Sequence, residues 1–171
     1  IGKLKVDVAE IKLKSLNPNT KIISYPFKLS EKNIEKTFID YDLILDGTDN
    51  FQTRYLINQY CFKQKKPLLF GAISQWDGQV SLYSPNDRTA CFECLFPESN
   101  NFNLPGSCSE NGVLGPLVGI IGSFMAGEAI KFVTRAGRSL KNELMLYDAL
   151  SGHMKRYKTE PRIDCKVCGS N

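Results

Sequence analysis

Two Cys-x-x-Cys pairs constrain this chain more than any other feature. They are Cys91-Phe92-Glu93-Cys94 and Cys165-Lys166-Val167-Cys168, with 70 residues between them. Each pair places two thiolates on one tight turn, and two such turns supply the four soft ligands of a closed tetrahedral zinc site. A fold built on that site must bring the end of the chain back to its middle. Because a closed site has no open coordination position, we expect it to hold structure and expect any catalysis elsewhere.

Composition is typical of an ordinary globular protein. The 171 residues are 42% hydrophobic and 23% charged, which suits one domain over residues 1–171. The net charge of +4 comes from Lys and Arg scattered along the sequence, so no nucleic-acid partner is expected. Residues 111–127 carry no charge, but they contain five glycines and a proline. They are also shorter than the roughly 20 residues of a membrane span, so a buried helix is favoured and no membrane association is expected.

The six cysteines leave two interpretations of the protein's environment. A disulfide-containing extracellular domain is one. Such domains are usually smaller and loop-rich, whereas this chain has enough apolar residues to fold without covalent links, so a reducing cytoplasm is favoured. No targeting segment is visible at the N-terminus.

Hydrophobic patterns predict an α/β fold. Residues 42–46 form a short apolar run typical of a buried strand, and Asp49 or Asn50 would cap a helix that follows. Later, Asp77-Gly78 predicts the turn of an antiparallel hairpin. The helices are expected over residues 3–16, about 30–39, about 51–65 and about 112–134, and the strands over 21–25, 42–46, 67–71, 73–76, 80–82, 143–148 and 153–158.

Several motifs in one order carry a family resemblance. They are Asp46-Gly47-Thr48-Asp49-Asn50, Cys91-x-x-Cys94, Gly112-Val113-Leu114-Gly115-Pro116, Glu128-Ala129-Ile130-Lys131 and Cys165-x-x-Cys168-Gly169. The set, which extends over essentially the whole chain, resembles the ThiF, MoeB and HesA sulfur-carrier adenylyltransferases, relatives of the ubiquitin-activating enzymes. The resemblance implies a doubly wound, Rossmann-like adenylation domain with a mixed sheet and a structural zinc site of four cysteines. That family's glycine-rich phosphate loop does not occur in these residues, so the chain is expected to correspond to the C-terminal part of the domain.

The resemblance also implies a reaction. In the family, the C-terminal glycine of a ubiquitin-like sulfur carrier protein attacks the α-phosphorus of ATP, giving an acyl-adenylate and pyrophosphate. A triphosphate held against a carboxylate needs cations and Mg²⁺ to spread the charge. The resemblance is compatible with thiamine biosynthesis, molybdopterin biosynthesis or another sulfur pathway. The alternative is a zinc-stabilised module that binds such a carrier without activating it.

Asp49 is the first residue to which the resemblance assigns a role. It follows a predicted strand, where doubly wound sheets bind ligands, and its carboxylate is a hard oxygen ligand suited to Mg²⁺. The alternative is that Asp49 only caps the following helix. Asp46, inside the strand, is expected to be structural. The resemblance also places Asn50 and Arg54 near the nucleotide, although Arg54 would equally brace the Asp49 loop or form a surface salt bridge.

Lys5 and Cys108 complete the set of candidate residues. Lys5 matches the family's phosphate-binding lysine, with a solvated helix residue as the alternative. Cys108 lies outside both cysteine pairs, and thiamine-type relatives can use a cysteine there to link covalently to the carrier; an unremarkable loop thiol is the alternative.

The other single residues are interpreted as structural. Cys61 is expected in the core and His153 in a structural or surface position. Glycines spaced by four, Gly115 with Gly119, are expected to let a neighbouring backbone approach their helix. Because family members are commonly homodimers, this helix is a candidate for the dimer contact; ordinary core packing is the alternative.

Overall fold

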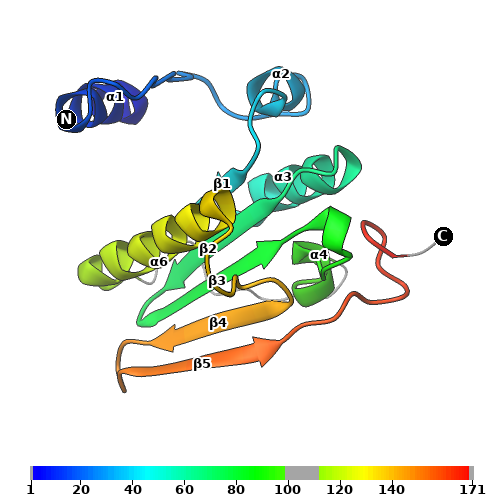
Figure 1. Ribbon diagram of the computed structural model, residues 1–171. Coiled ribbons are helices and arrows are strands. Elements are labelled where there is room, and N and C mark those ends of the chain that lie inside the picture. The colour runs from blue at the N-terminus through cyan, green and yellow to red at the C-terminus, as the bar shows by residue number, and fades with distance from the viewer. Residues whose placement is uncertain (1, 99–111, 170–171) are drawn as a thin grey trace. The chain divides into compact units, whose positions relative to one another are not determined.

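The computed structural model describes residues 2–98 and 112–169. Its contacts group the chain into two compact units, residues 1–30 and 31–171. The second unit holds a five-stranded sheet in the order β1-β2-β3-β4-β5 (Figure 1). Its strands are β1 (Ile44–Asp46), β2 (Leu68–Ser74), β3 (Asp77–Tyr83), β4 (Glu143–Asp148) and β5 (His153–Lys158).

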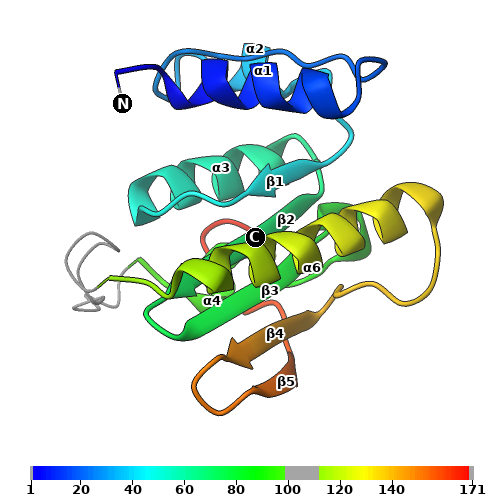
Figure 2. The ribbon, with the colours of Figure 1, turned by 90° about the vertical axis from the view of Figure 1, so that its left-hand side faces the viewer.

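The sheet is mixed, as predicted. β1 pairs with β2 in parallel, and the later strands continue antiparallel. α6 (Gly115–Thr134) crosses one face of β2 and β3, while α3 (Phe51–Lys63) and α4 (Phe92–Leu95) pack together on the other side (Figures 1 and 2). The remaining helices are α2 (Ile34–Phe38), which is shorter than predicted, and the 3-10 turn η1 (Pro85–Asp87).

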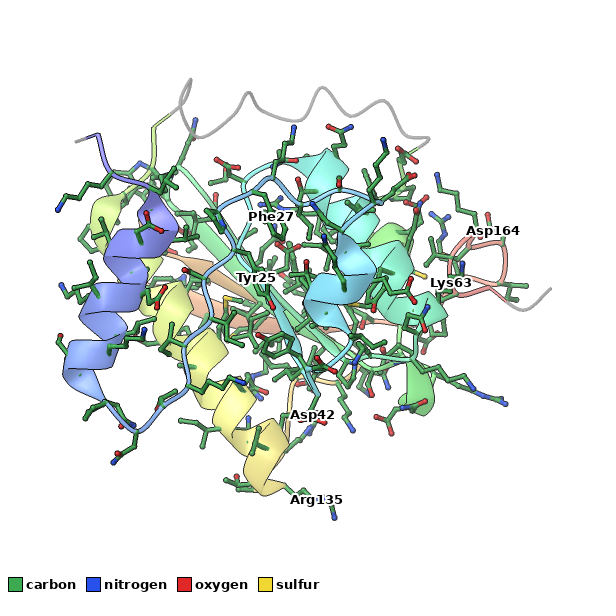
Figure 3. The ribbon with its side chains drawn as sticks, turned by 90° about the horizontal axis from the view of Figure 1, so that it is seen from above. Tyr25, Phe27, Asp42, Lys63, Arg135 and Asp164 are labelled. Carbon is green, nitrogen blue, oxygen red and sulfur yellow. The ribbon has the colours of Figure 1, made fainter. Side chains whose placement is uncertain are left out.

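The first unit contains α1 (Lys5–Leu16), as predicted, but the predicted strand over residues 21–25 is wrong. A strand requires a neighbour that completes its hydrogen-bond ladder. Among the described residues of this unit, α1 is the one regular element, so the β-rich segment has no ladder partner. Instead, Ser24 Oγ donates a hydrogen bond of 2.5 Å to the Glu10 carboxylate of α1, and the Tyr25 and Phe27 rings lie 5.5 Å apart (Figure 3).

The hairpin between β2 and β3 is confirmed, but its turn lies earlier than predicted. Ser74 pairs with Asp77, so the turn consists of Gln75 and Trp76, and Asp77-Gly78 belongs to β3. Gly78 is needed for a close approach, because a Cβ atom at this position would lie 2.3 Å from Ile121 Cδ1 of α6. Gly71 on β2 has the same role opposite Met125 of α6.

α6 is less buried than predicted. Leu117, Ile121 and Glu128 are buried, whereas Val118, Ile130 and Val133 are exposed. A Cβ atom added at any glycine of α6 would meet nothing within 4 Å among the described residues. The close approach that the sequence assigned to helix glycines therefore belongs to sheet glycines, and the glycine-rich face of α6 points away from the sheet. By length and composition alone, α6 is long and apolar enough to cross a membrane.

Candidate functional site

The loop after β1 is fixed from both sides. Asp46, the last residue of β1, is 2% exposed and accepts a 2.8 Å hydrogen bond from the Thr48 N–H. Arg54 of α3 is also buried, and its Nε donates to the Thr48 carbonyl at 3.1 Å, joined by its Nη2. The Arg54 guanidinium lies over the ring of Phe51, 5.2 Å from its centroid. Both backbone groups of Thr48 are thus held, one residue before Asp49.

Asp46 and Asp49 lie in different environments, the first buried and the second exposed. Burial raises the pKa of Asp46 above its ordinary value, although the Thr48 hydrogen bonds and the charge of Arg54 oppose the rise. The Asp46 carboxylate therefore lies inside the protein and holds the loop, as predicted for a structural residue. Asp49 is exposed, and among the described residues its carboxylate has neither a hydrogen bond nor an ion pair.

The helix cap belongs to Asn50. Its Oδ1 accepts a 2.9 Å hydrogen bond from the Thr53 N–H, which satisfies one of the free amides at the start of α3. Capping therefore does not explain Asp49. A free, exposed carboxylate beyond the carboxyl end of β1 fits a hard cation such as Mg²⁺.

The other candidates are distributed differently. Arg54 braces the Asp49 loop and is not a surface residue, so the interpretation as a surface salt bridge is wrong. Lys5 is exposed at the first position of α1, in the first unit of the chain. Cys108 lies outside the described residues. Cys61 is fully buried, as predicted, and burial raises the pKa of its thiol to about 12. His153 is exposed at the start of β5.

The four paired cysteines come together in one cluster. All four Sγ atoms lie within 4.8 Å of one another, with Cys91–Cys165 at 3.6 Å and Cys94–Cys168 at 3.2 Å. A disulfide bond would require about 2.05 Å. A tetrahedral zinc ion with Zn–S bonds of about 2.3 Å separates its sulfurs by about 3.8 Å, so this cluster has the dimensions of a zinc site.

Hydrogen bonds favour the ionised form of one sulfur in this cluster. The Cys91 thiol and then backbone amides, including the Arg162 N–H at 3.3 Å, hold the pKa of Cys94 below its ordinary value, whereas the hydrogen bond to Cys94 raises the pKa of Cys91 and burial raises that of Cys168. A thiolate is the form that binds a metal. The chemistry and the spacing of these sulfurs therefore both fit Zn²⁺.

Charged side chains inside the two Cys-x-x-Cys turns reinforce the cluster. Lys166 of the second turn lies 3.6 Å from the carboxylate of Glu93 in the first and 2.6 Å from that of Glu98. Glu93, only 2% exposed, also accepts from the Glu98 N–H. The sequence analysis missed this link, although opposite charges between paired cysteines are a visible signal.

An aromatic layer joins the cysteine cluster to the Asp49 loop. Phe92, between Cys91 and Cys94, is 1% exposed, and its ring centroid lies 5.0 Å from that of Phe70 and 6.0 Å from that of Phe51. Arg54 lies over the same two rings. Asn58 of α3, fully buried, fixes this arrangement by accepting a 3.0 Å hydrogen bond from the Phe92 N–H. Sequence reasoning found neither Phe92 nor Asn58.

Known proteins share both the sequence and the fold. The chain is 39% identical to the sulfur carrier protein adenylyltransferase of Thermus thermophilus over 99% of its length, and covers 64% of that protein. It is 35% identical over its full length to the adenylyltransferase and sulfurtransferase MOCS3 of Aedes aegypti, of which it covers 39%. The crystal structure of E. coli MccB superimposes on the whole chain with a TM-score of 0.83 at 17% identity, with 52% of MccB covered.

The chain therefore spans less than two thirds of each of these proteins. The MccB likeness, at 17% identity, concerns the fold alone. The ThiF family matches residues 1–167, nearly the entire sequence. We conclude that the chain belongs to the ThiF family.

Proposed function

We propose that this chain takes part in the ATP-dependent adenylylation of the C-terminal glycine of a ubiquitin-like sulfur carrier protein. Two relatives covering 99% or more of the chain are named as adenylyltransferases, one of them for a sulfur carrier protein. The structural observation that carries the proposal is the exposed Asp49 carboxylate, presented by a loop that Asp46 and Arg54 fix. Neither capping nor ion pairing among the described residues accounts for it.

Each candidate residue would have a separate role in this reaction. A carboxylate oxygen of the carrier forms a bond to the α-phosphorus, and the bond from that phosphorus to pyrophosphate breaks. The carrier's carboxylate is already ionised at neutral pH, so no general base is required. Asp49 would hold Mg²⁺, which when bound spreads the phosphate charge, and Lys5 would contact the phosphates as a point charge. Arg54 positions Asp49 through the Thr48 carbonyl.

A matched pair of variants tests the role of Asp49. Asp49→Asn removes the charge but keeps the shape, and carrier-dependent exchange of pyrophosphate into ATP by the natural gene product should fall at least a hundredfold. Asp40→Asn, at another exposed carboxylate, should leave exchange unchanged. Exchange that survives Asp49→Asn with the parent's Mg²⁺ requirement contradicts the assignment. A parent that binds the carrier without any exchange supports the non-catalytic alternative.

We propose Zn²⁺ as the occupant of the cysteine cluster, in a reducing, cytoplasmic environment. Its four sulfurs have the spacing of a closed tetrahedral site. Metal analysis should find one zinc per chain and Cys165→Ser should lose it, while Cys61→Ala, which alters a buried thiol outside the cluster, should retain it. Metal-free protein with paired disulfides would refute this.

We also propose self-association through the outward face of α6. Val118, Ile130 and Val133 are exposed there, at helical spacing around glycines with open space above them. Light scattering should give twice the chain mass, and Ile130→Asp should return it to one. A monomeric parent would contradict this.

A further inference from the structure

The net charge of the protein resides in one segment. Residues 135–162 contain seven Lys and Arg residues against three acidic ones, a net charge of +4, and the rest of the chain has fifteen of each sign. The whole formal charge of the protein therefore lies on β4, β5 and their flanking turns. Acidic residues are as frequent in this segment as in the rest of the chain, so the net charge arises because seven of the 22 Lys and Arg residues are concentrated here.

β5 presents this charge at an open edge of the sheet. Among the described residues it is the last strand in the sheet order, and all six of its residues are exposed (Figure 1). The Thr159 N–H donates to the Asn142 carbonyl, so Asn142 and Thr159 form a hydrogen-bonded pair at the end of the antiparallel ladder between β4 and β5. Along an antiparallel ladder, hydrogen-bonded pairs alternate with pairs that are not hydrogen-bonded. Met154, Arg156 and Lys158 belong to pairs that are not hydrogen-bonded, so their backbone N–H and C=O groups point to the free edge.

A cationic pocket adjoins the end of β5. It has a volume of about 400 Å³, and its lining includes four cationic residues, Arg88, Arg138, Lys141 and Lys158, and two acidic ones, Glu143 and Glu160. The buried carboxylate of Glu143 holds Arg138 and, at 3.7 Å, Arg156. Among the described residues, Arg88 and Lys158 have no carboxylate partner. Glu160 can offset only one of these two charges, so the pocket keeps a net positive charge next to the strand edge.

Register places this edge within reach of the Asp49 loop. A row of paired residues crosses the sheet from Asp46 of β1 and ends at Tyr157 of β5; between them it passes through Phe70, Ser81 and Leu144. Four steps between strands, at about 4.8 Å each, make about 19 Å. An extended peptide of about six residues covers that distance. A protein seated on β5 can therefore deliver its own chain end to Asp49.

We propose that the β5 edge and its cationic pocket form the docking surface for the folded part of an acidic carrier protein. The identity of the partner rests on the proposed function; the surface itself rests on charge and geometry. An acidic strand or loop pairs with the free backbone of β5 and places carboxylates against Arg88 and Lys158. Edge lysines also protect strands from aggregation, but protection does not require that η1 and the turn before β4 bring further cations to the same pocket.

Charge-reversal variants of the natural gene product test this surface. The probe is the ubiquitin-like sulfur carrier of the source organism, and its dissociation constant is measured without ATP at low and at physiological salt. Lys155→Glu with Lys158→Glu, two exposed positions without ion-pair partners among the described residues, should weaken binding at least tenfold at low salt and less at high salt. Lys32→Glu with Lys63→Glu, an equal charge change at exposed positions elsewhere, should change binding less than threefold.

The outcomes separate the surface from the activity. If the parent exchanges pyrophosphate and the β5 variant keeps parental carrier affinity, the surface is refuted while the proposed function stands. If the parent binds the carrier without exchange and the β5 variant loses binding, the proposed function fails and the surface stands. If the parent does not bind the carrier, the proposed docking surface is refuted. It is also refuted if the β5 variant keeps carrier binding and loses only binding to a 20-nucleotide single-stranded RNA.

Discussion

Replacing Arg54 with Met removes the brace of the Asp49 loop and keeps most of the apolar stem. Two hydrogen bonds from a charged group to the Thr48 carbonyl are lost, as are the contacts of the guanidinium with the Phe51 and Phe70 rings. Hydrogen bonds to charged groups contribute about 1.5–3 kcal/mol and a cation–π contact about 1 kcal/mol. Because Met still packs, we expect the free energy of unfolding to fall by about 2–4 kcal/mol.

Urea unfolding followed by circular dichroism, without nucleotide, measures this loss. Arg135→Met, at an exposed arginine, should stay within about 0.5 kcal/mol of the parent. If Arg54 braces the loop, Arg54→Met loses stability even in the absence of ATP. If Arg54 only contacts nucleotide, the variant keeps parental stability and has a raised KM for ATP. Arg54→Met protein with parental stability would therefore refute the reasoning from the Thr48 carbonyl.

Three further predictions concern the residues around this brace. Phe92→Ala should lower the free energy of unfolding by about 3–5 kcal/mol in the same assay, because it empties the buried aromatic layer. If zinc occupies the cysteine cluster, as we propose, its removal by a chelator should lower the midpoint of thermal unfolding, since the metal would bind only the folded cluster. Burial raises the pKa of Asp46, so its ionised form costs stability: the parent should gain stability relative to Asp46→Asn as pH falls through the raised pKa, and lose it as pH rises. Equal pH profiles would contradict this.

Local sequence signals were sufficient where the structure depends on near neighbours. The apolar run before Asp46 and the polar residues after it predict β1, its turn and the start of α3, because a short apolar strand and a helix cap each have a short-range signature. The predicted burial holds for Ile44 and Asp46, whereas Leu45 is exposed. The cysteine spacing likewise predicts the four-sulfur cluster. Each turn supplies two soft ligands, and two turns complete a four-sulfur site.

Signals failed where a distant partner decides the outcome. Residues 21–25 have strand composition, but no ladder partner among the described residues of their unit. Gly78 has the sequence of a turn, yet α6, which comes much later in the chain, requires a residue without a side chain there. Asn58 and Phe92 are joined by one hydrogen bond across 34 residues, and nothing local to either marks it. Such residues become visible only when tertiary contacts are known.

The cysteine cluster and the Asp49 loop, two separate motifs in the sequence, form one mechanical unit. Phe92 belongs to the first Cys-x-x-Cys turn, and its ring packs on Phe70 and Phe51, the two rings over which Arg54 lies. Arg54 in turn holds the backbone that presents Asp49. A closed cysteine site has no open coordination position. It does hold Phe92, whose ring packs on Phe70 below Arg54. A continuous path of packed side chains therefore joins the four cysteines to the loop that presents the exposed carboxylate.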